Sequence, residues 1–102
     1  MTTVDLEKGR RETLRWLVLV TLNAARPIGA AETLISSCVN DVQKQVTLVE
    51  LRREMDYLAD RGLVAVERNG PQWHAELTRC GVDVVEYTVE CDPGIARPQK
   101  YW

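Results

Sequence analysis

Hydrophobic residues in the first quarter of the chain recur at the spacing of an α-helix. One side of this helix carries Leu14, Leu17, Val18, Thr21 and Leu22. The opposite side carries Trp16, Leu19 and Val20, so the second half of the helix is apolar nearly all round. The pattern predicts a helix over residues 4–25, capped by Thr2 or Thr3. It ends at Arg26-Pro27 because the residue before a proline avoids the helical conformation.

Two more helical patterns follow this proline. The first covers residues 30–39 and is expected to turn Ala31, Leu34, Ile35 and Cys38 inward. After a polar turn, Thr47 and Glu50 have the spacing of a capping box, which marks the start of a third helix. That helix extends to about residue 61, where Gly62 is the expected left-handed stop. Its predicted core positions are Leu48, Leu51, Met55 and Leu58.

The last third of the chain changes from helical to strand-like periodicity. Residues 63–68 and 72–77 flank Asn69-Gly70-Pro71, which predicts a β-hairpin. Thr78 can cap a final helix over residues 79–90, with Val82, Val85 and Val89 on one face. Residues 91–102 contain two prolines and a glycine and should form an extended or loosely docked tail. We therefore expect a mostly helical domain over residues 1–90, in the order helix, helix, helix, hairpin, helix.

Residues 51–64, LRREMDYLADRGLV, resemble the L-x-x-x-L-x-x-L-x-x-x-G-L-V pattern of MarR-like and ArsR-like regulators. Leu77-Thr78 followed by Gly81 is similar to the way many of their wings enter the last helix. The resemblance implies a winged helix-turn-helix fold. Chain size, element order and the segment Gly94 to Pro98 also resemble small ArsR-like proteins of Mu-like phages and prophages, which implies a phage context. The first hypothesis is therefore a DNA-binding transcription regulator of phage or prophage origin.

In this fold the third helix enters the major groove of double-stranded DNA. Its face opposite the core carries Val49, Glu50, Arg53, Tyr57 and Asp60, with Arg52 adjoining. Arg53 is central on that face, and arginine is the commonest reader of guanine. The alternative is an ordinary solvated face, because Glu50, Asp56 and Asp60 would repel phosphates.

Polar residues on either side of this helix complete the candidate DNA surface. Lys44, Gln45 and Thr47 stand at its entry, where they could bind backbone phosphate or simply form a polar turn and a cap. Arg68, Asn69, Gln72 and His74 belong to the wing, where Arg68 could contact a phosphate or the minor groove. Asn69-Gly70 is equally explained by a tight turn, and His74 by a surface or partly packed position.

Charge does not favour nucleic acid as strongly as the fold does. The 102 residues include 13 Lys and Arg against 15 Asp and Glu, a net charge of −2. Most nucleic-acid binders are basic. DNA binding must then use a local patch or a dimer. The other hypothesis is a protein-interaction module, in which the acidic surface and Tyr101-Trp102 dock a phage or host protein.

A homodimer is expected from apolar residues outside the predicted core stripes. These are Trp16, Leu19 and Val20 on the first helix and Val84 and Tyr87 on the last. One small domain cannot easily bury both sets, and closed two-fold dimers are the commonest solution.

No pattern for catalysis, metal or cofactor binding stands out, so we expect no enzyme, no metal and no cofactor. Cys38, Cys80 and Cys91 form no CxxC pair, and an odd number of thiols suits a reducing cytoplasm. The longest apolar run, residues 16–20, is too short to span a bilayer. The start of the chain lacks the features of a secretory signal, which also predicts a cytoplasmic location.

Overall fold

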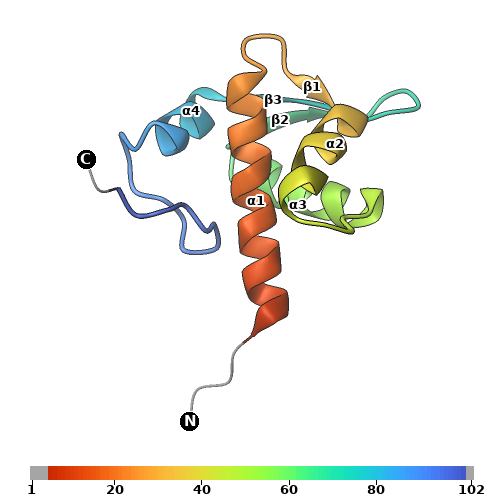
Figure 1. The fold of residues 1–102 in the computed structure, drawn as a ribbon. Coiled ribbons are helices and arrows are strands. Elements are labelled where there is room, and N and C mark those ends of the chain that lie inside the picture. The colour runs from red at the N-terminus through yellow and green to blue at the C-terminus, as the bar shows by residue number, and fades with distance from the viewer. Residues whose placement is uncertain (1–4, 101–102) are drawn as a thin grey trace.

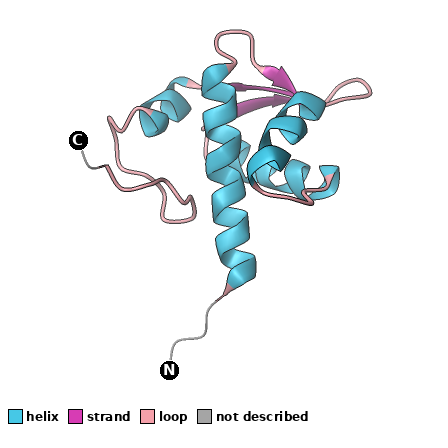
Figure 2. Cartoon of the chain, in the orientation of Figure 1, coloured by secondary structure: helices cyan, strands magenta, loops and turns pink. Residues whose placement is uncertain are grey.

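The structure, a computed structural model, describes residues 5–100 and contains four helices and three short strands in that range (Figures 1 and 2). In chain order these are α1 (Leu6–Ala24), β1 (Ala30–Ala31), α2 (Glu32–Val42), α3 (Leu48–Asp60), β2 (Val64–Glu67), β3 (His74–Leu77) and α4 (Arg79–Val85). α1 runs through the middle, with α2 and α3 on one side and α4 on the other (Figure 1). The fold is thus mostly helical with one small antiparallel sheet, as the sequence predicts.

The sheet contains a strand that the sequence did not reveal. Its order is β1-β3-β2, and β1 pairs with β3 through Ala30 opposite Ala75. Two residues are too few to show the alternation by which a strand is recognised. Because β1 leads directly into α2, this pairing ties the start of α2 to the hairpin.

The core lies between α1, α2, α3 and the sheet. α1 contributes four fully buried side chains, and α3 contributes Leu51, Met55 and Leu58. In α2 the buried residues are Glu32, Ile35 and Val39. The predicted stripe was wrong for Leu34 and Cys38, which are exposed, and Leu48 of α3 is also exposed where a core position was expected. α2 is therefore rotated about its own axis relative to the prediction, so that Val39, and not Cys38, packs in the core.

The predicted starts of α3 and α4 and the predicted stop of α3 are confirmed. Thr47 Oγ1 accepts from the Glu50 amide, and Thr78 Oγ1 accepts from the Gly81 amide, at 3.1 Å each. Gly62 has φ +74°, as a left-handed stop requires. Asp5 caps α1 by accepting from the Lys8 amide. The predicted caps Thr2 and Thr3 lie outside the described residues.

The hairpin loop is longer than the sequence suggested. Val64 faces Leu77 and Glu67 faces His74, so residues 68–73 form the connection. In this loop Gly70 has positive φ and Asn69 does not. The expected tight turn over Asn69-Gly70-Pro71 was therefore too short.

The C-terminal part also differs from the prediction. α4 ends at Val85, five residues early, and Tyr87 has φ +63°. Val84 lines its buried face, whereas Val89 is exposed. The tail has no regular structure but is firmly docked, because Ile95 is buried and the Ala96 amide donates to the Glu12 carbonyl at 3.1 Å. The predicted boundary at residue 90 thus separates segments that share one core.

Candidate nucleic-acid interface

The outer face of α3 is exposed where the sequence placed its DNA-reading residues. Val49 is 80% exposed and lies in the first turn, and the Arg53 side chain, one turn later, is 62% exposed. Leu51, Met55 and Leu58 anchor the opposite side of the helix in the core. α3 therefore offers a rigid surface with Arg53 near its middle.

Arg53 can leave Glu54, its one ion-pair partner within residues 5–100, at little cost. Arg53 Nε lies 3.3 Å from Glu54 Oε2. Glu54 is 1% exposed, and Arg15 Nε binds its other oxygen at 2.8 Å. Because Arg15 keeps this buried carboxylate compensated, Arg53 remains available for an external partner.

Arg52 has a structural role instead of pointing outward. Its guanidinium binds Glu32 at the start of α2 through two hydrogen bonds, one from Nε at 2.6 Å. Glu32 is only 2% exposed, and the hydrogen bonds from Arg52 hold the pKa of its carboxyl below the ordinary value. Removing one partner of a buried pair strands a charge and is strongly destabilising. Arg52 therefore joins α3 to α2.

Trp73 connects the hairpin loop to α3, a contact that the sequence analysis missed. The guanidinium groups of Arg52 and Arg68 each lie 5.0 Å from its ring centroid. Arg68 also pairs with Asp56 of α3. Cation–π contacts of this kind contribute about 0.5–1 kcal/mol each at exposed sites. The sequence shows that Trp73 is an aromatic residue close to Arg68 in the chain. Only the folded structure shows that Arg52 and Arg68 both stack on its ring.

The turn before α3 is held by α1. Arg10 Nη2 donates to the Lys44 and Gln45 carbonyls at 3.3 and 3.0 Å, and both side chains stay exposed. Arg10 Nε also binds Glu50 at 2.8 Å, which lowers the pKa of the Glu50 carboxyl. Glu50 therefore faces α1, not the outer surface, and its predicted place on the reading face was wrong.

Tyr57 also lies away from that face. Its ring is stacked between Arg15 and Arg61, whose guanidinium carbons are 3.5 and 3.7 Å from the centroid. Its hydroxyl lies 3.4 Å from Asp92 Oδ1 in the tail, and burial raises its pKa. Tyr57 holds the tail in place, and its proposed DNA contact is corrected.

The remaining wing residues lie at or near the loop. Asn69 is exposed in the loop, and Gln72 accepts a hydrogen bond from Thr33 of α2 at 2.9 Å. His74 is half-buried in β3 opposite Ala31 and packs near Gly29. The loop is thus tied to both α2 and α3.

Intramolecular carboxylates compensate most of the cationic surface. Nine of the ten arginines pair with Asp or Glu. The tenth, Arg97, donates to the Val84 and Val89 carbonyls. Any phosphate must compete with these partners, which agrees with the net negative charge of the chain.

Two residues of the predicted dimer surface are core residues of the single chain. Leu19 and Val84 are buried, so the domain covers them itself and this part of the prediction was wrong. Trp16 packs edge-on against Tyr87, whose hydroxyl donates to the Pro98 carbonyl at 2.7 Å. Val20 remains exposed and lines a groove of about 410 Å³ with Leu34 and Cys38, between α1 and α2.

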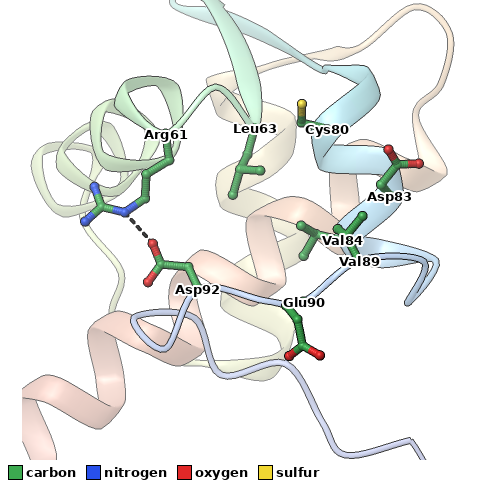
Figure 3. A pocket seen from close by; sticks show the side chains of 8 residues that line it. All are labelled: Arg61, Leu63, Cys80, Asp83, Val84, Val89, Glu90 and Asp92. Atoms are coloured by element: carbon green, nitrogen blue, oxygen red, sulfur yellow. Dashed lines mark hydrogen bonds and ion pairs between the residues drawn. The ribbon is translucent and has the colours of Figure 1, made fainter.

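A second cavity, of about 300 Å³, lies beside α4 (Figure 3). Leu63, Val84 and Val89 form its apolar part, and Arg61 Nε binds Asp92 Oδ2 at 2.6 Å on one side. Cys80 stands at its edge, and no histidine lines the cavity.

Within residues 5–100 no three His, Cys, Asp or Glu side chains are grouped to hold a metal ion. No helix in that range could cross a bilayer.

Comparisons with protein-family models, curated proteins and solved structures give no match to this chain.

Proposed function

We propose that this chain is a winged-helix DNA-binding protein, with α3 as the recognition helix and the β2–β3 loop as the wing. One observation carries the proposal: α3 exposes Arg53, and the hairpin loop is joined to the same helix through the Arg68–Asp56 ion pair. The pairing of β1 with β3 supports it, because it fixes the hairpin against the two helices of the motif.

Five exposed residues of α3 and its flanks have roles in this arrangement. Arg53 reads a base edge in the major groove, and Arg68 contacts the backbone. Lys44 and Thr47 lie at the start of α3, where backbone amides attract a phosphate. Val49 suits a thymine methyl group. The sequence resemblance suggests a phage context, in which the protein acts as a transcription regulator. The apolar residues outside the core stripes suggest a homodimer, and the unpaired cysteines suggest the cytoplasm.

The test is fluorescence anisotropy with labelled duplexes at low salt. The duplexes to compare are random DNA and the DNA that flanks the protein's own coding region. Arg53→Ala should cost about 1–3 kcal/mol on the preferred duplex and relax sequence preference. Arg68→Ala should weaken all duplexes alike and reduce the salt slope by about one. The matched control is Arg79→Ala, since Arg79 is exposed on α4, away from α3.

A protein-interaction module is the second candidate. Two observations favour it: nearly all arginines are already paired, and apolar Leu48 and Val49 are exposed at the start of α3. In that case Arg53→Ala and Arg68→Ala would leave DNA affinity unchanged. Failure of the folded wild-type protein to bind either duplex would refute the DNA-binding proposal and favour this candidate.

A further inference from the structure

The two arginines stacked on Trp73 are held by very different carboxylates. Arg52 binds Glu32, which is buried at the start of α2. Arg68 binds Asp56, and the two side chains are 46% and 47% exposed. Both guanidinium groups lie at the same distance from the ring. The two arginines therefore differ in the exposure of the carboxylate that each one binds.

We propose that Asp56 is an internal substitute for a DNA phosphate. It holds Arg68 over Trp73 in the unbound protein and releases Arg68 when a backbone phosphate arrives, whereas Arg52 stays on Glu32. The proposal rests on the proposed DNA-binding function and names the residue that limits its affinity.

The exchange follows from exposure and geometry. An exposed ion pair contributes little to stability, so separating Arg68 from Asp56 is cheap. A phosphate offers arginine the same two-oxygen acceptor as a carboxylate. Moving Arg52 would instead strand the buried Glu32 charge. Of the two cations, only Arg68 can therefore change partner without disturbing the fold.

The same arrangement explains how an acidic chain could bind DNA weakly. With Arg68 neutralised by Asp56, this arginine offers no uncompensated positive charge to a duplex. A backbone phosphate must replace the carboxylate before contact is made. Removing that carboxylate should therefore strengthen binding to all duplexes alike.

The experiment compares Asp56→Asn with Asp60→Asn in the same duplex titrations. Asp60 lies about one turn further along α3, is exposed, and does not hold Arg68. Both variants remove one negative charge near the DNA, so simple electrostatics predicts equal gains. Release of Arg68 predicts a gain about threefold or more larger for Asp56→Asn, the size expected from one exposed ion pair.

Arg68→Ala in both backgrounds provides the decisive control. Without Arg68 there is nothing for Asp56 to release, so the two Asn variants should then gain equally. Equal gains with Arg68 present would overturn the role of Asp56 and leave the DNA-binding proposal intact. Absence of duplex binding in the wild type and all variants would overturn both.

Discussion

At the scale of the residue, Glu32 shows how a buried carboxylate contributes to stability beside α3. Glu32 is held ionised by Arg52, and its lowered pKa means that the folded state binds the proton more weakly than the unfolded state. The stabilisation is therefore present above the unfolded pKa, about 4.3, and is lost as the pH falls through the folded value. Glu32→Gln should destabilise the protein most at neutral pH, and the difference from wild type should shrink on acidification below about pH 4.

Urea unfolding across this pH range measures the effect. Glu76→Gln is the control, since Glu76 is exposed on β3 and its variant should follow the wild-type profile. A Glu32→Gln deficit that stays constant from neutral to acidic pH would contradict the linkage.

At the scale of elements, the tail behaves as part of the folded domain. Ile95 is buried in the core, and Arg15 Nη1 binds the Gly94 carbonyl at 2.8 Å. Ile95→Ala should therefore cost about 2 kcal/mol or more, as for other buried aliphatic truncations. The control is Val89→Ala, because Val89 is exposed and its truncation should cost much less. Urea unfolding gives both values, and an Ile95→Ala cost as small as that expected for an exposed residue would contradict the docking of the tail.

At the scale of the whole molecule, the α1–α2 face is the best place for a second copy. Leu34, Cys38 and Val42 are exposed at four-residue spacing along α2, and Val20 of α1 lines a groove with Leu34 and Cys38. Exposed apolar patches of this kind mark interaction sites. We expect a homodimer in sedimentation at about 100 µM, well above typical dimer constants, and a monomer for Leu34→Glu.

Two controls distinguish a dimer formed through this face from non-specific association. Val89→Glu makes the same change on the α4 side and should remain dimeric. In the wild type, alkylation of Cys38 should slow as protein concentration rises, while exposed Cys80 reacts at a constant rate. A wild-type monomer at about 100 µM, or a dimeric Leu34→Glu protein, would rule out this interface.

Features that depend only on residues close together in the chain could be predicted from the sequence. The helical spacing predicted α1 and α3, and Thr47, Thr78 and Gly62 marked helix ends because capping acts within about four residues. The hairpin was also recognisable from its local pattern. Its loop length was not, because strand register depends on side chains from both strands.

The partner that each side chain contacts depends on the tertiary fold and could not be predicted. Local periodicity predicted that α2 would bury Leu34, yet Val39 is buried instead, because packing against α1 and α3 sets the helix rotation. The partners of Arg52 and Arg68 lie 20 and 12 residues away in the chain. A pattern of charges shows that arginines are present but not which carboxylates neutralise them. That pairing requires the folded chain, and it separates a structural arginine from one that is available to a ligand.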